Sequence, residues 1–458
     1  MGGNPKMSRE HRDYHSHAYP TARTGFQRER AASIQMARNR VFLTLESISI
    51  LGTQIGFTML PLVALYALDA SPIQLGVLTA VDYIPFIIFG VFFGAVIDAS
   101  DPQSISIASN IVRLAAICLL LVAFMVGQAN VQVLIIAVFI IALGSAAYDT
   151  SVQSLVPLVF ERRELTMVNG RFELGRSLGG TLGPAIAGAV LAHGGPAPGL
   201  AVLVATYALG LAGVLSIRPT AIGDTAQSWR RHRLAWSLTS TRDGFRYLNG
   251  RRDVLAAICL AAVSNLANGA LNALAFLHLK NEFAMSPEQT GIVGSIAGAM
   301  AIISALGAGR LARIASARVS MLISLLTACA SAVVFALADV GAGWRVSVFG
   351  VVLGANYCAN QIFNVRMISY RQATVSGSFL ARVNAAAKAL IMAALPVGSL
   401  VGGALATATS AGSAILILSG VATIAVLAIA VASKTVGWRD DRAAATDADR
   451  LSGPDGRG

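Results

Sequence analysis

The chain repeats itself at an offset of 215 residues. The pattern Ser-Pro-x-Gln-x-Gly occupies residues 71–76 and returns at 286–291. The same offset aligns further glycines, Gly183 with Gly398 and Gly188 with Gly403. Both copies are strongly apolar, so single identities arise easily by chance, but one ungapped offset aligns all of these positions. The repeat predicts two fused halves of one membrane unit, which is typical of transporters whose path runs between the halves.

The composition is that of an integral membrane protein. Of the 458 residues, 55% are hydrophobic and 13% are charged, and the mean hydropathy is +0.66. A soluble protein would carry about 25% charged residues. Residues 41–68 contain no lysine or arginine and a single acid, Glu46, and they exceed the roughly 20 residues that a helix needs to cross hydrocarbon. Further apolar runs follow, so this segment is not a cleaved signal peptide.

Twelve apolar segments predict an all-α integral membrane fold, with twelve transmembrane helices in two six-helix bundles that are parallel repeats. The expected segments are about 41–67, 72–97, 104–127, 130–157, 166–192 and 199–217, and then 254–279, 288–309, 317–338, 344–366, 384–407 and 411–433. Five regions result: a disordered cytoplasmic arm at 1–40, an N-terminal bundle at 41–217, a cytoplasmic amphipathic linker at 218–253, a C-terminal bundle at 254–433 and a disordered cytoplasmic tail at 434–458.

The distribution of positive charge predicts the orientation. The net charge is +12, and the basic residues gather near the N-terminus, in 218–252 and in short loops on one side. Cytoplasmic loops carry such an excess, so we expect both termini inside and contact with anionic lipids of the inner leaflet, not with nucleic acid. Within the linker, Leu234, Leu238, Phe245 and Leu248 share one helical face, which predicts a helix lying on that leaflet. The richness in Ala, Gly and Arg indicates a GC-rich bacterial genome, so we expect the membrane to be the bacterial cytoplasmic (inner) membrane.

The fifth apolar segment contains a glycine motif. Its members Gly170, Gly179, Gly183, Pro184 and Gly188 follow the spacing Gly-x8-Gly-x3-Gly-Pro-x3-Gly. Small residues along one face let two helices approach closely. Ordinary small-residue packing is the alternative, but the full spacing with its Gly-Pro pair favours a dedicated motif.

A second motif follows the second segment. Gly90, Gly94 and Asp98 have the spacing Gly-x3-Gly-x3-Asp, and Arg313 aligns with Asp98 at the repeat offset. Arg382 lies at the beginning of the eleventh segment, and residues 242–248 form a basic-aromatic stretch in the linker.

With these motifs, the chain is similar to the major facilitator superfamily over about residues 38–435. The first motif resembles the signature of its exporters and antiporters, with a final Ala-Gly in place of Gly-Gly. The second resembles its loop 2–3 signature but lacks the cation that normally follows the aspartate. Residues 242–248, with Arg382, look like the drug:H+ antiporter subgroup, which includes macrolide-efflux and siderophore-export proteins. The resemblance implies alternating access between two halves and, as a rule, a monomer.

Ionisable residues inside apolar segments are costly and usually mark a pathway. Glu46, Arg113 and Asp149 lie near the predicted cytoplasmic ends of spans one, three and four, and Asp82 lies near the middle of span two. We expect Arg113 to compensate Glu46 or Asp149, and we take these two acids as the main candidates for proton coupling, with Asp82 as a further candidate. An ion-pair network that only orients helices fits the same cluster equally well.

The second half carries amides instead. Span seven has Asn265, Asn268 and Asn272 on one face, and span ten has Asn356, Tyr357, Asn360, Gln361 and Asn364. Such stripes either bond neighbouring helices or line a cavity. We predict a substrate cavity, to which Gln54 of span one also contributes, because the resembling family places spans seven and ten beside its central path.

Together, these features predict a secondary transporter that exports a small amphipathic molecule, such as a drug, siderophore or secondary metabolite, by proton antiport. An importer of a sugar, metabolite or lysophospholipid is the first alternative, and a lipid-modifying membrane enzyme is a remote one. We expect no cofactor and no metal. No Gly-x4-Gly-Lys-Ser/Thr loop is present, so we expect no ATP hydrolysis.

Overall fold

The computed structural model describes residues 22–88, 101–217, 244, 246–314, 316–375 and 377–432. Within them the regular structure is helical. The elements are α1 (Ala22–Tyr66), α2 (Pro72–Ile88), α4 (Pro102–Met125), α5 (Val131–Val159), α6 (Leu165–Gly194), α7 (Pro196–Ser216), α10 (Arg252–Phe283), α11 (Pro287–Ile314), α12 (Ala317–Leu337), the 3-10 helix η2 (Ala342–Trp344), α13 (Arg345–Thr374), α14 (Gly377–Ala408) and α15 (Ala411–Ala432). The predicted all-α integral membrane fold is confirmed.

Local sequence signals explain where these helices begin. The side chains of Asp101, Asn130 and Ser316 accept hydrogen bonds from the third residue along, at the beginnings of α4, α5 and α12, and so satisfy backbone donors that a helix leaves free. Proline opens α2, α4, α7 and α11, where its missing N–H costs nothing.

The lengths and the apolar composition of the helices are those of membrane-spanning segments. Among the described residues, nine helices are long and apolar enough to cross one, and α2 is a shorter apolar helix. Large apolar side chains lie on the outer surface, for example Leu119, Ile424 and Ile303, which are 71%, 70% and 68% exposed. Such side chains are stable facing lipid tails, whereas the backbone polar groups are satisfied inside the helices.

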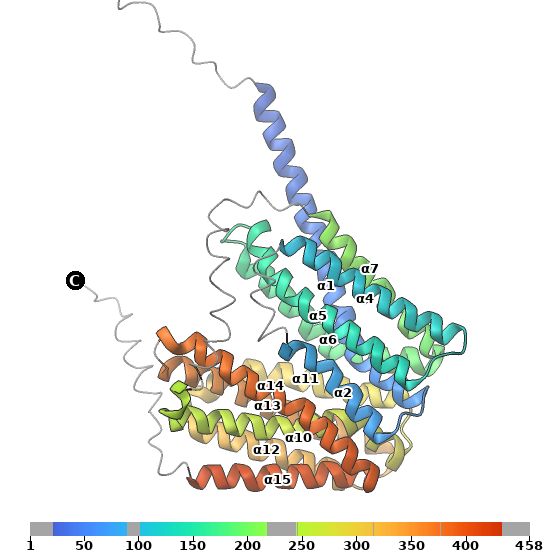
Figure 1. Ribbon diagram of the computed structural model, residues 1–458, viewed down its shortest axis with the longest axis vertical. Coiled ribbons are helices and arrows are strands. Elements are labelled where there is room, and N and C mark those ends of the chain that lie inside the picture. The colour runs from blue at the N-terminus through green and yellow to red at the C-terminus, as the bar shows by residue number, and fades with distance from the viewer. Residues whose placement is uncertain are drawn as a thin grey trace, which may run out of the picture.

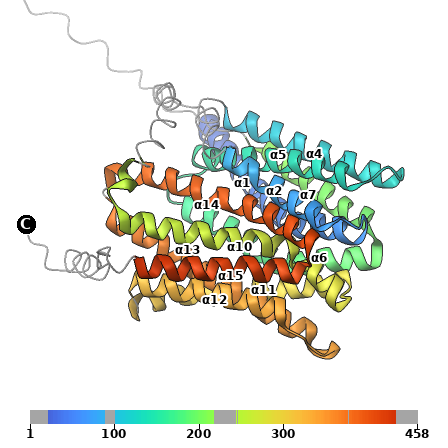
Figure 2. The same cartoon turned by 60° about the horizontal axis from the view of Figure 1, so that its bottom comes forward.

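The helices form two bundles (Figures 1 and 2). The first contains α1, α2 and α4 to α7, and the second contains α10 to α15. Inside the first, α1 packs on α6 and α7, and α4 packs on α5; inside the second, α10 packs on α14, and α12 on α13 and α15. The bundles meet along two pairs of helices, α2 with α14 and α6 with α11.

These two contacts are copies of each other at the repeat offset. On one side Gly76 lies against Gly403, and on the other Gly291 lies against Gly188. A Cβ on Gly403 would lie 3.1 Å from the Cα of Gly76, and a Cβ on Gly188 would lie 3.0 Å from the Cα of Gly291. Backbones this close require glycine. The repeat read from the sequence therefore corresponds to a pseudo-twofold interface.

The turns that follow α1 and α10 also match. Ser71 and Gln74 bond each other's backbone N–H groups, and Ser286 and Gln289 do the same, which is a capping box in each half. Each turn contains a non-glycine residue with positive φ, Asp69 at 46° and its repeat partner Ala284 at 49°. The repeat thus extends to backbone conformation. We call the end of the molecule that holds these two turns the contact end, and the opposite end the linker end.

Polar contacts between described residues of the two halves lie toward the contact end. Tyr66 donates to the carbonyl of Met285 at 2.8 Å and lies 2.9 Å from Thr290 Oγ1. Lys280 bonds the Leu65 carbonyl at 2.7 Å and pairs with Asp69 at 2.9 Å. Two more contacts join α6 and α11: the backbone N–H of Ala185 donates to Ser295 at 2.9 Å, and His193 lies 3.4 Å from Glu288.

The predicted N-terminal arm (1–40) and the predicted linker (218–253) are each described in part by the structure. Helix α1 begins at Ala22, so residues 22–40, which we expected to be disordered, are helical; the stretch is rich in Arg and Ala, which favour helix. Most of the predicted linker lies outside the described residues, including Leu234, Leu238 and Phe245. Its last part packs on the C-terminal bundle, where Leu248 is buried.

The residues just before α10 are anchored by a charged pair. Arg251 makes two hydrogen bonds to Asp253, at 2.9 and 2.7 Å, and one to the Thr374 carbonyl at 2.8 Å. Tyr370 donates to the same carboxylate at 2.8 Å. The hydrogen bonds that Arg251 donates to the Asp253 carboxylate raise the pKa of Arg251 above its usual value. This anchor ties the end of the linker to α13.

Candidate functional site

A buried polar cluster lies inside the first bundle, where α1, α4 and α5 meet. Tyr148 of α5 donates a short hydrogen bond to the carboxylate of Glu46 on α1. Its ring also lies beneath a guanidinium, with the Cζ of Arg113 5.1 Å from the ring centroid. Glu46, Arg113 and Tyr148 are each 3% exposed or less. Tyr148 therefore stands between the acid and the base and touches both.

Arg113 of α4 is held by neutral groups rather than by an ion pair. Its Nη2 donates to Thr53 Oγ1 at 2.6 Å, and its Cζ lies 4.1 Å from the ring centroid of Tyr207 on α7. Its Nε makes no hydrogen bond with any described residue. A cation stacked between two aromatic rings is stabilised by their quadrupoles, which helps a buried guanidinium persist without a carboxylate in contact.

Gly144 of α5 makes room for the Arg113 side chain. A Cβ at Gly144 of α5 would lie 2.7 Å from the Cγ of Arg113 and 3.1 Å from the backbone oxygen of Ser109. Any larger residue would displace the arginine stem. The close packing of α4 on α5 at this level therefore depends on Gly144.

Asp149 follows Tyr148 and extends the cluster toward α6. Its carboxylate interacts electrostatically with the guanidinium groups of Arg176 and Arg113, and Glu46 also interacts with Arg113, Arg176 and Asp149. The expected grouping of Glu46, Asp149 and Arg113 is therefore present. Among these described residues the interaction is through space, because no ion pair joins Arg113 to either acid.

Asp82 lies in a different place, on α2 beside the second bundle. Its carboxylate is half-buried and makes no hydrogen bond or ion pair with the described residues, and none of their basic groups acts on it. The next residue, Tyr83, interacts electrostatically with Asp82 and with Tyr357 of α13. Tyr83 of the first half thus lies within electrostatic range of Tyr357 in the second half.

The asparagines of the second bundle form a network between helices. Asn268 of α10 and Asn360 of α13 bond each other reciprocally, at 2.8 and 3.3 Å. Asn360 also donates to Asn356 Oδ1 at 3.0 Å, and Asn356 donates to the Ala328 carbonyl of α12 at 2.9 Å. Asn265 donates to the Ile391 carbonyl of α14 at 2.8 Å. Four predicted cavity residues are therefore engaged in bonds that join helices, and their contact with substrate stays a prediction.

The remaining predicted cavity residues form no such bonds with other described residues. Asn272, Gln361 and Asn364 are exposed, and Tyr357 is half-buried. Gln54 of α1 packs against α6, since a Cβ on Gly179 would lie 2.6 Å from the Gln54 Cβ. Their contact with a substrate stays a prediction.

The glycine motif of α6 lets that helix fit between α1 and α11. A Cβ on Gly183 would lie 3.2 Å from the backbone oxygen of Gln54. A Cβ on Gly294 of α11 would lie 2.9 Å from the Cβ of Pro184. One turn further along α6, the backbone of Gly188 lies against the backbone of Gly291. Gly170, by contrast, has open space around it. The motif thus serves one contact within the first bundle and one between the bundles.

The second motif, which follows the second apolar segment, lies largely outside the described residues. Gly90, Gly94 and Asp98 lie outside the described residues, as does the side chain of Arg313. Arg382 of α14 is half-buried, with its Cζ 5.3 Å from the Phe379 ring centroid, and its backbone oxygen faces Gly244 of the linker.

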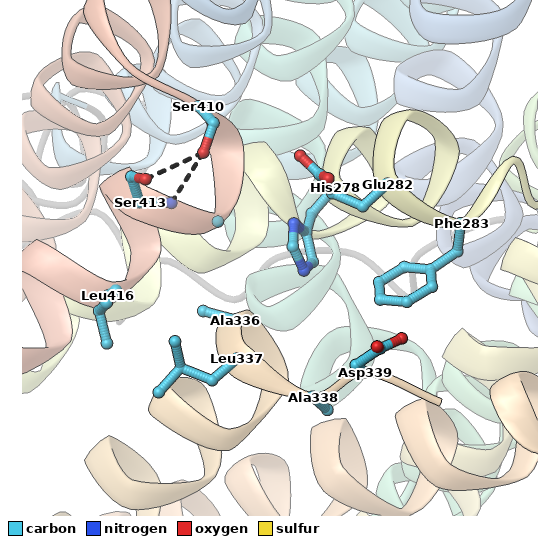
Figure 3. Close-up of a pocket in the computed structure, with 11 residues that line it drawn as sticks. His278, Glu282, Phe283, Ala336, Leu337, Ala338, Asp339, Ser410, Ser413 and Leu416 are labelled. Atoms are coloured by element: carbon cyan, nitrogen blue, oxygen red, sulfur yellow. Dashed lines mark hydrogen bonds between the residues drawn. The ribbon is translucent and has the colours of Figure 1, made fainter. Parts of the chain in front are cut away.

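One pocket of about 350 Å³ opens at the contact end, among α10, α12 and α15 (Figure 3). His278 lies at its side, with Glu282, Phe283 and Asp339 around it, and the Ser410–Ser413 pair caps α15 opposite. Both ring nitrogens of His278 are buried, and among the described residues the backbone of Phe335 interacts with this ring. None of the residues predicted for a site lines this pocket. Within the described residues, no group of three His, Cys, Asp or Glu side chains has the arrangement of a metal site.

Sequence reasoning missed the tyrosines. Tyr148 and Tyr207 lie in apolar spans in which an aromatic residue is usually core, and only the three-dimensional contact with Glu46 and Arg113 distinguishes them. A signal was present for Tyr148, since it directly precedes Asp149, which is the one charged residue in the sequence of this segment.

Comparison with known proteins agrees with this architecture. The sequence profile of the Major Facilitator Superfamily matches residues 42–381. The nucleoside transporter NupG is similar in structure, with a TM-score of 0.66 at 14% identity, over 87% of this chain and 100% of that one. A bacterial homologue of the iron transporter ferroportin, in an inward-facing state, has a TM-score of 0.65 at 15% identity, over 86% and 99%. A bacterial homologue of the lysosomal transporter Spinster, inward-facing and unoccupied, has 0.63 at 13% identity, over 90% and 98%. No curated protein sequence matches significantly.

Proposed function

The chain belongs to the major facilitator superfamily, and from that premise we propose that it exports a small amphipathic molecule in exchange for protons by alternating access. The observation that carries the proposal is the buried Glu46–Tyr148–Arg113 cluster. A carboxylate removed from water, with a hydroxyl donor and a nearby cation, can take up and release a proton as its surroundings change.

The cluster has the parts that a proton carrier needs. Glu46 accepts from Tyr148, whose hydroxyl can rotate when the carboxyl becomes protonated. Arg113 keeps a positive charge near Glu46 and Asp149 without being tied to either, and no described residue accepts a hydrogen bond from its Nε. A permanent ion pair would hold the acid in its charged form; a cation at longer range leaves it free to titrate.

The interface between the halves supports alternating access. The two glycine contacts, Gly76 with Gly403 and Gly188 with Gly291, are related by the repeat and lie toward one end. Around them, Tyr66 and Lys280 bond across the halves. Rocking about such matched contacts opens one end as it closes the other. If the contact end faces outward, as the charge distribution predicts, this is a conformation closed to the outside, as in the inward-facing relatives named above.

A transport assay in liposomes tests the proposal. The purified chain is reconstituted, a pH gradient is imposed, and uptake of radiolabelled erythromycin and tetraphenylphosphonium is measured with the lumen acidic and then with the gradient abolished. Antiport predicts accumulation that requires the acidic lumen and that Glu46→Gln removes. The matched control is Glu161→Gln, an exposed acid outside the cluster. Uptake independent of the gradient, or unchanged in Glu46→Gln, contradicts proton antiport; accumulation only under the opposite gradient indicates import.

A further inference from the structure

The pocket at the contact end takes no part in the proposed function (Figure 3). Its volume of about 350 Å³ is within the range of small-molecule sites. The described residues that line it come from α10, α12 and α15 and from the turns beside them. It therefore belongs to the second bundle alone, whereas the halves meet through α2 with α14 and α6 with α11. An occupant of this pocket is distinct from a molecule that crosses between the halves.

The imidazole of His278 is built into the wall of this pocket. The residue is 3% exposed, and its ring extends from α10 toward α12 and α15 (Figure 3). The centroid of the ring lies 5.7 Å from the ring centroids of Phe283 and Phe335. Gly412 of α15 leaves space for it, because a Cβ there would lie 2.8 Å from the His278 Cε1. The position of the ring is thus fixed by packing from three helices.

One nitrogen of this ring remains for a ligand. The backbone of Phe335 interacts with the ring, and Phe335 lies in the last turn of α12, where carbonyl groups lack partners within the helix. A neutral imidazole donates through one nitrogen and accepts through the other. When the N–H is given to that carbonyl, the second nitrogen is a buried acceptor to which no described residue donates. A buried acceptor without a donor is costly, so the pocket favours a ligand with an N–H or O–H group.

Two carboxylates line the same pocket. Glu282 and Asp339 are exposed, and neither makes an ion pair with a described residue. Arg345 lies over the Phe283 ring, but it bonds the Phe283 and Val340 carbonyls, at 2.9 and 3.1 Å, rather than either acid. The described lining residues include no lysine or arginine. Their net charge is therefore negative, which favours a cation.

Much of the remaining lining is apolar and borders the outer surface of the bundle. Leu337 and Leu416 line the pocket on α12 and α15, and Leu337 is 63% exposed, as side chains that face lipid tails are. Ser410 and Ser413 are engaged in capping α15, where the Ser413 N–H donates to Ser410 Oγ at 3.1 Å. A ligand in this pocket thus meets both negative charge and hydrocarbon.

We infer that this pocket binds a primary ammonium group carried on an apolar chain. The three N–H donors of an ammonium match the carboxylates of Glu282 and Asp339 and the buried ring nitrogen of His278, and the chain lies along Leu337 and Leu416. A metal ion is a poorer match, because the described residues include no metal-like group of three ligands. The ethanolamine headgroup of a membrane lipid and a soluble alkylamine both carry this group.

Binding of hexylamine to the full chain in phosphatidylcholine nanodiscs tests this inference. Hexanol is the comparison, because it keeps the chain and replaces the ammonium with a neutral hydroxyl. Calorimetry measures both affinities, with the signal from empty nanodiscs subtracted. We expect hexylamine to bind about tenfold more tightly than hexanol, since hydrogen bonds between charged groups are stronger than neutral ones.

Variants at the two acids should leave the core intact, because both acids are exposed. Glu282→Gln combined with Asp339→Asn should weaken hexylamine binding about tenfold and leave hexanol binding unchanged. The matched control is Glu161→Gln, an exposed acid of the first half, which should bind hexylamine as the parent does. His278→Phe keeps an aromatic ring but removes both nitrogens, so it should weaken hexylamine binding roughly threefold. Thermal unfolding shows whether each variant is folded.

Nanodiscs that also contain phosphatidylethanolamine identify the source of the ammonium group. Weaker hexylamine binding in these nanodiscs, for the parent but not for the double variant, shows that the lipid headgroup occupies the pocket. Equal binding in the two kinds of nanodisc assigns the pocket to a soluble amine.

Two results overturn the inference: equal affinity for hexylamine and hexanol, or hexylamine binding that is unchanged in the double variant. Unchanged binding in His278→Phe overturns the part assigned to the imidazole. The test involves no transport step. Failure of gradient-driven uptake therefore leaves this site standing, and loss of the site leaves proton antiport standing.

Discussion

Tyr148 donates a hydrogen bond to Glu46 while its ring lies beneath Arg113, 5.1 Å from the guanidinium carbon. One side chain thus contacts the acid and the base of a cluster in which the two make no ion pair. Because a hydroxyl donor stabilises the charged carboxylate more than the neutral carboxyl, Tyr148 sets how readily Glu46 holds its proton.

Replacing Tyr148 with phenylalanine tests that role. The variant keeps the ring beneath Arg113 and removes only the hydroxyl, so Glu46 should hold its proton to higher pH. The other charged groups that act on Glu46, namely Arg113, Arg176 and Asp149, are unchanged. We therefore expect the pH profile of transport to move to higher pH. An unchanged profile, measured in proteoliposomes between pH 5 and 9 (about two units each side of neutrality), would show that Tyr148 is structural.

The two acids of the cluster should be required for coupling. We expect Asp149→Asn and Glu46→Gln to reduce proton-driven export about a hundredfold or more, as loss of a positioned proton-transfer group typically does, while membrane insertion remains normal. Proton uptake reported by an internal pH dye, together with expression level in the membrane fraction, checks both points. Normal coupling in both variants would assign the cluster to helix orientation alone.

Gly183 should tolerate no side chain. A Cβ there would lie 3.2 Å from the backbone oxygen of Gln54 and 3.2 Å from the backbone nitrogen of Ile55, and backbone cannot move aside as a flexible side chain can. We expect Gly183→Leu to separate α6 from α1 and to reduce transport in proteoliposomes about tenfold or more, since overpacking costs roughly 1–3 kcal/mol.

The matched control for Gly183 is the same substitution in open space. Gly420 of α15 has no atom within 4 Å of its ideal Cβ, so Gly420→Leu should transport normally. Gly170, the first glycine of the motif, is equally open, and Gly170→Ala should be neutral or should stabilise α6 slightly. Impaired transport in Gly420→Leu would mean that bulk alone, not its location, causes the effect.

The reciprocal pair Asn268–Asn360 should show strong thermodynamic coupling. Replacing either residue with leucine leaves the half-buried partner amide without this bond, at a cost of about 1–3 kcal/mol. The double variant removes both amides, so its destabilisation should be smaller than the sum of the two single effects. Thermal unfolding of the purified variants measures this cycle. Additive effects would indicate that the amides act separately, for example on a ligand.

The contacts at the contact end should bias the conformational equilibrium more than the stability. The Lys280–Asp69 pair is largely exposed on the Asp69 side, and such pairs contribute about 0–1 kcal/mol. Lys280→Met combined with Tyr66→Phe also removes bonds to Leu65, Met285 and Thr290. We expect faster labelling of a cysteine introduced at Ser295 by a membrane-impermeant reagent, with a melting temperature within a few degrees of the parent. Unchanged labelling would place the closing contacts elsewhere.

The interface between the halves was largely encoded in the repeat. The offset that aligns Gly76 with Gly291 and Gly188 with Gly403 also predicts that these glycines occupy equivalent positions, and the structure pairs them across the two symmetric contacts. The capping boxes were readable for the same reason, because Ser-Pro-x-Gln is a local signal. The sequence did not show which glycine meets which, since partners on different helices are set by packing.

The candidate site was only partly accessible to sequence reasoning. Glu46, Arg113 and Asp149 stood out because charge is rare in apolar segments, and their grouping on neighbouring helices is observed. Arg113 rests on Tyr207 and Thr53 rather than on an acid, and no spacing rule reveals this, because the contacts join α4 to α7 and α1. The asparagine stripes were visible, but the reciprocal Asn268–Asn360 bond depends on the approach of α10 and α13.

The sequence by itself determined the membrane class, the helices and the duplication, because hydropathy, caps and an ungapped repeat are properties of short stretches of chain. Tertiary structure alone decided that Tyr148 joins Glu46 to Arg113, that Asp82 has no counter-charge among the described residues, and that the halves meet through paired glycines. The physical reason is that the environment of a polar group within a helical bundle is supplied by other helices, and their rotation and depth follow from the packing of the whole assembly.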